Sequence, residues 1–140
     1  MALILTYPGV PSIYAGDELG LEGENGEAGR RTIAWDRRDQ WDLEFLQSVK
    51  DLIAIRRTNI ALCDGGLRWL EISDDYLFFA RESSAQTLLI FISRSAVQVN
   101  IDLTQFGFSI TRTLFGKTQS GTNISIYSQS ATSGIWEVTH

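Results

Sequence analysis

The stretch VQVNIDL, residues 97–103, alternates strictly between apolar and polar side chains. Successive side chains of a β-strand point to opposite faces of a sheet, so this stretch predicts a strand with one face in the core. The buried face of that strand is expected to carry Val97, Val99, Ile101 and Leu103.

Six other runs predict strands, at residues 67–72, 76–81, 87–93, 110–115, 124–127 and 134–138. Short stretches rich in serine, glycine, aspartate and asparagine separate them. Short strands at this spacing indicate an antiparallel β-sandwich rather than parallel strands joined by helices. We therefore predict a sandwich domain over residues 64–140.

Residues 1–63 follow a different pattern, which predicts a strand, a long loop and a helix. The apolar run at residues 3–7 ends at Pro8-Gly9 and is typical of a short strand buried on both faces, although its periodicity also fits a helix end. The loop at residues 15–39 is rich in glycine and acids and exceeds ordinary connections in length. Loops of that length in compact domains are usually functional or mobile.

The predicted helix spans residues 41–59 and is amphipathic. Its apolar side chains recur at three- and four-residue spacing, at Phe45, Leu46, Val49, Leu52 and Ile53. Either Asp39 or Asp42 is placed to cap its start. Arg56 and Arg57 are expected mostly off the apolar stripe, near the negative end of the helix dipole.

Charge and composition narrow the possible partners. The 140 residues carry a net charge of −5 and have no lysine or arginine stripe, which argues against nucleic-acid binding and favours a neutral ligand. The opening apolar run is too short to span a membrane, and no basic region typical of a secretory signal precedes it. We expect no membrane association and a cytoplasmic location.

Few residues are suited to nucleophilic or metal chemistry. Cys63 is the single cysteine and His140, the last residue, is the single histidine. This excludes an intrachain disulfide, leaves no cysteine partner for zinc, and gives a serine or cysteine triad no plausible histidine. We expect no metal and no cofactor.

The long loop concentrates acids, at Asp17, Glu18, Glu22, Glu24 and Glu27. Glycoside cleavage needs two carboxyl groups about 5–9 Å apart across a sugar ring, and spacing along a loop does not place two groups in that way. The sequence therefore favours a solvated acidic loop.

Several segments, in order, resemble the α-amylase family of glycoside hydrolases. Residues 8–20, PGVPSIYAGDELG, resemble the segment after the eighth barrel strand. Residues 30–36, RRTIAWD, resemble a segment of the neopullulanase, cyclomaltodextrinase and α-glucosidase branches. Residues 52–57, LIAIRR, resemble the last barrel helix, and residues 76–81 and 88–92 resemble early strands of the C-terminal sandwich.

This resemblance implies a mixed fold. Residues 1–63 would be the last strand, loop and helix of a (β/α) barrel, and residues 64–140 the C-terminal β-sandwich. The family carries its catalytic aspartates and glutamate after the fourth, fifth and seventh strands, ahead of the matching region. We therefore expect the C-terminal portion of an α-glucan-acting hydrolase of carbohydrate metabolism, without catalytic residues and inactive alone.

The resemblance also implies a sugar-lining role for three residues. Arg30 would lie near the donor-side sugars, or alternatively brace the loop by a salt bridge to Glu24 or Glu27. Tyr14 and Trp35 are candidates to stack on sugar faces, with packing beneath the barrel rim as the alternative. Asp17 and Glu18 match a position that stabilises the loop.

Three kinds of partner follow from this interpretation. The first is an α-glucan or maltooligosaccharide in the intact enzyme. The others are an upstream barrel segment and a second copy of the chain, because residues 1–60 alone would expose apolar faces. Two alternative functions remain: one half of a split amylase-type enzyme, or a noncatalytic α-glucan-binding module with a platform from Trp69, Tyr76, Tyr127 and Trp136.

Overall fold

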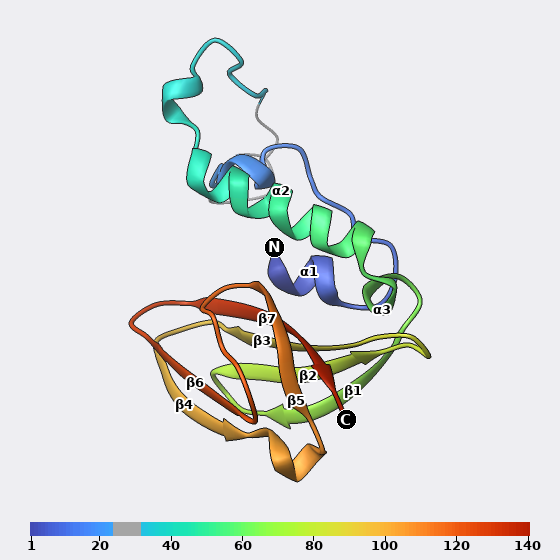
Figure 1. Ribbon diagram of the computed structural model, residues 1–140. Helices are drawn as coiled ribbons and strands as arrows, with labels where there is room; N and C mark the ends of the chain where they lie inside the picture. Colours follow the sequence, from blue (N-terminus) through green and yellow to red (C-terminus); the bar gives the residue numbers. More distant parts are fainter. Residues whose placement is uncertain (24–31) are drawn as a thin grey trace.

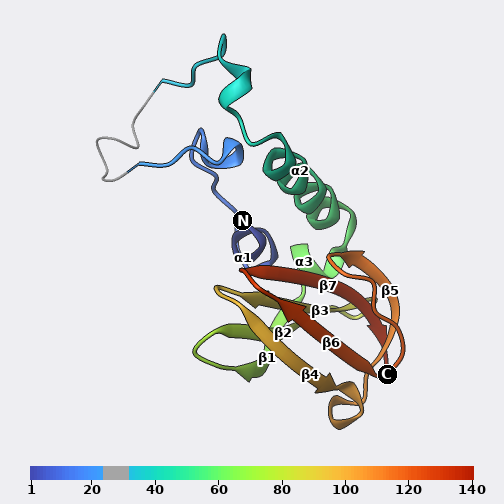
Figure 2. The ribbon, with the colours of Figure 1, turned by 90° about the vertical axis from the view of Figure 1, so that its left-hand side faces the viewer.

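A computed structural model describes residues 1–23 and 32–140 of the chain. These residues form three layers, in which helices cover one face of a five-stranded antiparallel sheet and a two-stranded ribbon covers the other (Figures 1 and 2). The strands are β1 (Gly66–Ile72), β2 (Tyr76–Glu82), β3 (Thr87–Ser93), β4 (Val97–Asp102), β5 (Ser109–Phe115), β6 (Asn123–Ser128) and β7 (Thr132–Thr139). The large sheet has the order β1-β2-β3-β7-β5, and β4 pairs with β6. The antiparallel sandwich predicted for the second half of the chain is confirmed.

Strands β2 and β3 are apolar on both faces because each face lines a separate core. One face supplies Phe78 and Phe91 to the core between the two sheets. The other supplies Phe79 and Ile90 to the core beneath the helices. These central strands therefore read as continuous apolar runs, whereas β4, with one face in water, alternates.

The predicted strand at residues 97–103 ends one residue early. Its inward face is confirmed, since Ile101 and Leu103 are buried and Val97 and Val99 pack against the same core. Leu103, however, begins a 3₁₀ turn, η3 (Leu103–Phe106), because the Asp102 carboxylate accepts the Thr104 N–H at 2.9 Å and caps that turn.

The barrel strand predicted at residues 3–7 is wrong. The segment forms a short helix, α1 (Ala2–Thr6), which lies between the sheet and α2 (Leu43–Thr58). Every strand pair within residues 1–23 and 32–140 is antiparallel, so an extended segment here would find no parallel neighbour. A helical turn pairs its own backbone groups instead, and Leu5 fills the core beneath α2.

Helix α2 is confirmed, but it begins at Leu43 rather than at Trp41, and one predicted face is wrong. Asp42 caps the helix by accepting the Phe45 N–H at 2.8 Å, and Val49 and Leu52 are buried. Arg56 is buried as well, on the apolar stripe rather than off it. The described residues also include three short helical segments: η1 (Asp17–Leu19), η2 (Arg38–Gln40) and α3 (Ile60–Cys63). Within the described ranges, none of the helices is long and apolar enough to cross a membrane.

Candidate functional site

The loop that carries Tyr14 is anchored on the first turn of α2. Gly16 has φ +107°, a left-handed conformation that glycine adopts readily, and the Glu18 carboxylate accepts its N–H at 2.8 Å. Leu19 is buried, and its carbonyl accepts the Asp42 N–H at 3.2 Å. Glu18 therefore stabilises the loop, as the resemblance implied.

The loop presents two aromatic side chains to solvent. Tyr14 is 58% exposed and Trp35 is 63% exposed. The Trp35 ring meets Trp41 edge-on, with centroids 5.6 Å apart, and the Arg38 guanidinium lies 5.4 Å from the Trp41 ring centre. Trp35 thus packs against Trp41, at the end of η2, while most of its surface stays open to a ligand or a neighbouring segment.

The third predicted sugar-lining residue, Arg30, lies outside the described residues. Its alternative salt-bridge partners, Glu24 and Glu27, lie there too. The structure therefore places Tyr14 and Trp35 but leaves the role of Arg30 as a prediction.

Two buried arginines hold the segment that leads into this loop. Arg56 of α2 donates to the carbonyl oxygens of Leu5 at 2.9 Å, Tyr7 at 3.1 Å and Gly9. These bonds fix the chain where it leaves α1. Arg56 thereby determines the direction in which residues 9–23 depart from the helical layer.

Arg81 of β2 binds the neighbouring backbone. It is fully buried and donates to the carbonyl oxygens of Thr6, Gly65 at 2.7 Å and Gly66 at 3.3 Å. Burial, and then repulsion from Arg56, lowers the pKa of Arg81. In the part of the chain that the structure describes, neither guanidinium forms an ion pair with a carboxylate. The two arginines, which we call the arginine pair, therefore act by binding backbone carbonyls.

The spacing of the two arginines relative to apolar residues indicated that both are buried, although their charge suggests a surface position. Arg56 follows Val49 by seven positions and Leu52 by four, which places it on the apolar stripe of α2. Arg81 follows Phe79 by two positions, which places it on the same face of β2. Treating arginine as a surface residue concealed both.

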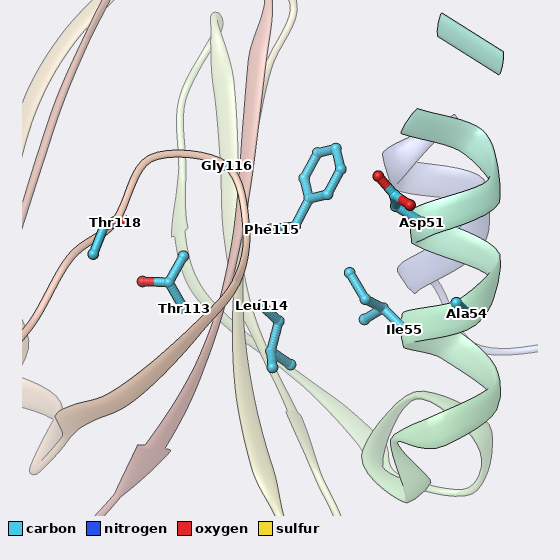
Figure 3. Close-up of a pocket in the computed structure, with 8 residues that line it drawn as sticks. All are labelled: Asp51, Ala54, Ile55, Thr113, Leu114, Phe115, Gly116 and Thr118. Atoms are coloured by element: carbon cyan, nitrogen blue, oxygen red, sulfur yellow. The ribbon is translucent and has the colours of Figure 1, made fainter. Parts of the chain in front are cut away.

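A groove runs between α2 and β5, on the side of the sheet that the helices cover (Figure 3). It has a volume of about 610 Å³ and is lined by Asp51, Ala54, Ile55, Thr113, Leu114, Phe115, Gly116 and Thr118. Figure 3 shows Phe115 and Ile55 reaching into the space between strand and helix. A single carboxylate, Asp51, lines the groove, whereas glycoside cleavage uses two.

The four aromatic residues considered as a glucan platform differ in exposure. Trp136 is buried in the core between the sheets, and Tyr76 stacks on Phe91 with ring centroids 5.1 Å apart. Trp69 is partly exposed and meets Phe79 edge-on at 5.3 Å. Tyr127 is 65% exposed, so it is the most accessible of the four.

No carboxylate and histidine cluster suited to a metal ion occurs within residues 1–23 and 32–140.

No family model matches the chain. It is 34% identical over 106 residues to the intracellular maltogenic amylase of Bacillus subtilis, which covers 74% of this chain and 18% of that enzyme. It is 38% identical over 93 residues to a cyclomaltodextrinase of Geobacillus thermopakistaniensis, covering 65% of this chain and 16% of that enzyme. The chain is homologous to the C-terminal part of α-amylase-family enzymes.

A solved structure supports the same relationship. A debranching enzyme of Nostoc punctiforme superposes with a TM-score of 0.74 and 30% identity, over 97% of this α-amylase-family segment and 27% of the enzyme. The segment thus spans less than a fifth of the length of the two curated relatives, 18% and 16%. Its sandwich layer corresponds to the C-terminal β-domain of these enzymes.

Proposed function

We propose that the chain is the C-terminal portion of an α-glucan-acting glycoside hydrolase whose catalytic acids lie outside these 140 residues. The observation that carries this proposal is the match to enzymes named as a maltogenic amylase and a debranching enzyme, at 34% and 30% identity. A cytoplasmic location is part of the proposal, because the Bacillus subtilis relative is named an intracellular enzyme.

Two of the described carboxylates support the proposal because their hydrogen bonds serve the fold. Glu82 pairs with Arg68 at 2.7 Å, and hydrogen bonding to that guanidinium lowers the pKa of Glu82. The bonds from Thr104 likewise lower the pKa of Asp102. A glycosidase general acid needs a raised pKa, so neither group is suited to that role.

In the intact enzyme, residues 1–63 and 64–140 would have different tasks. The sandwich, residues 64–140, would cover apolar surface of the catalytic domain. Residues 1–63 would contribute one wall of the sugar cleft, with Arg30, Tyr14 and Trp35 toward the substrate. The exposure of Tyr14 and Trp35 supports this assignment.

An exposed apolar face supports the need for a larger assembly. It comprises Leu3, Ile4, Tyr7, Val10 and Trp69, with Val10 96% exposed. The Tyr7 and Trp69 rings lie 6.5 Å apart, and exposed apolar side chains of this kind are typical of a surface that another part of a protein covers. The remaining domains of the hydrolase are our choice of partner. Self-association is the alternative, and a sedimentation coefficient that rises with protein concentration would support it.

A chimera tests the proposed function. This chain would replace the region of the Bacillus subtilis intracellular maltogenic amylase that aligns with it, and the same enzyme lacking that region would be the control. We expect the chimera to fold and hydrolyse a maltooligosaccharide, and the truncated control to be inactive. A chimera that folds, by circular dichroism and thermal unfolding, but releases no sugar would contradict the proposal.

A noncatalytic glucan-binding role is the second candidate, and the exposure of Tyr127 favours it. Such a role is compatible with membership of a larger hydrolase. The two candidates separate experimentally, because binding by the chain alone requires no catalytic domain.

A further inference from the structure

The outer face of the β4–β6 ribbon carries only polar residues and one tyrosine. The strand register pairs Gln98 with Tyr127, Asn100 with Ser125, and Asp102 with Asn123, and all six are exposed. The intervening residues, such as Ile101 and Ile124, face the core. The six outward residues include no lysine or arginine, so this face is unsuited to phosphates or acidic ligands.

Tyr127 stands between two hollows on this ribbon. One, of about 280 Å³, is lined by Ala96, Val97, Gln98, Tyr127, Ser128 and Gln129. The other, of about 80 Å³, reaches Lys117, Ser133 and Trp136. The Gln129 side-chain amide donates to the Tyr127 hydroxyl at 3.3 Å and braces the ring. The core does not account for this ring, because the adjacent Ile126 takes the inward position.

The chemistry around Tyr127 matches a neutral polyhydroxylated ligand. An aromatic ring offers an apolar face to the C–H groups of a sugar, and each side-chain amide both donates and accepts hydrogen bonds, as sugar hydroxyls do. Gln98 and Gln129 flank the ring, and Asn100 lies two residues further along β4. The uncharged amides complement an uncharged glycan.

We propose that the outer face of the β4–β6 ribbon, centred on Tyr127 with Gln98 and Gln129, is a binding site for an α-glucan chain, separate from any catalytic cleft. The choice of an α-glucan rests on the proposed function, whereas the site itself rests on the exposed tyrosine, its hollows and the amides. The site lies on the side of the large sheet opposite the helical layer, from which the loop with Tyr14 and Trp35 extends (Figure 2).

Titration of the full 140-residue chain with maltoheptaose tests this site. Two-dimensional amide NMR should show shifts that concentrate at residues 96–100 and 125–129. Tyr127→Ala should weaken binding about tenfold, the effect of losing a favourable aromatic contact. Tyr127→Phe keeps the ring and should bind nearly as well as the natural chain. Tyr7→Ala, at an exposed tyrosine of the opposite layer, is the matched control and should leave affinity unchanged.

Three outcomes would overturn the proposal. They are an absence of maltoheptaose binding at millimolar concentration, undiminished binding by a folded Tyr127→Ala chain, and equal binding of a β-linked cello-oligosaccharide, which would refute the α-glucan assignment. None of these outcomes bears on the chimera, whose hydrolysis of a maltooligosaccharide tests the proposed function independently. An active chimera with no site at Tyr127 would therefore separate the two failures.

Discussion

Arg81 shows how a single buried cation joins two parts of this chain. Its guanidinium binds the carbonyl of Thr6 at the end of α1 and those of Gly65 and Gly66 at the start of β1. Arg81→Met keeps much of the side-chain volume but leaves these carbonyls without donors. We expect a loss of about 2–4 kcal/mol in the free energy of unfolding, because buried acceptors would lose their partners.

Urea denaturation measures this loss. The control is Arg57→Met, at an exposed arginine next to Arg56, which should change the free energy of unfolding by less than about 0.5 kcal/mol. Equal stabilities for the two variants would show that the arginine pair does not hold the segment.

Tyr76 gives the fold a dependence on alkaline pH. Burial, followed by its hydrogen bond to Glu71, raises the pKa of Tyr76 to about 12. In the unfolded chain the tyrosine hydroxyl titrates near pH 10. The contribution of Tyr76 to the free energy of unfolding is therefore complete below about pH 10 and is lost as the pH rises through 12. Between these pH values we expect the free energy of unfolding of the natural chain to fall by about 1–2 kcal/mol, and that of Tyr76→Phe to fall by less.

Denaturation curves at several pH values between 9 and 12, about the range in which tyrosines titrate, would measure this difference. Tyr14→Phe, at an exposed tyrosine, serves as the control and should follow the natural chain. A parallel decline in the natural chain and in Tyr76→Phe would exclude Tyr76 as the source.

At the scale of elements, the cap of α2 is the most direct test. The sequence offers Asp39 and Asp42 as alternative caps, and the structure selects Asp42, whose carboxylate accepts the Phe45 N–H at 2.8 Å. Asp42→Ala should lower the free energy of unfolding by about 1 kcal/mol, and Asp39→Ala by much less. Thermal unfolding of both variants would check this, and a larger loss in Asp39→Ala would contradict the assignment.

The strands were predictable from sequence because the order of apolar and polar residues along a strand reflects which of its faces are buried. Alternation identified β4, and continuous apolar runs identified β2 and β3, within two residues at each end. The short run at residues 3–7 was not predictable in this way, since five apolar residues fit a strand or a helix and only tertiary contacts decide. In this chain Leu5 packs against Leu52 and the sheet, and the helix results.

The candidate site was less predictable than the fold. Tyr14 and Trp35 were found through resemblance, and their exposure fits a role at a surface. The arginine pair was missed because arginine was treated as a surface residue, although the spacing of Arg56 and Arg81 places both on apolar faces. The carbonyls that they bind, such as those of Leu5 and Thr6, are distant in sequence, and local spacing does not identify them.

At the scale of the whole molecule, the chain combines a well-packed sandwich with an exposed apolar face around α1. The two cores account for the stability of residues 64–140 and for the attachment of the helices. The side chains of the apolar face stay exposed among the residues that the structure describes. We infer that the remaining domains of a larger hydrolase cover it, and that these domains supply the catalytic acids.

The most direct measurement is a turnover assay of the isolated chain, purified free of amylase, with maltoheptaose and with pullulan. We predict no release of reducing sugar above the buffer blank from either substrate. Steady hydrolysis by the isolated chain, abolished in Asp17→Asn or Glu18→Gln, would contradict it.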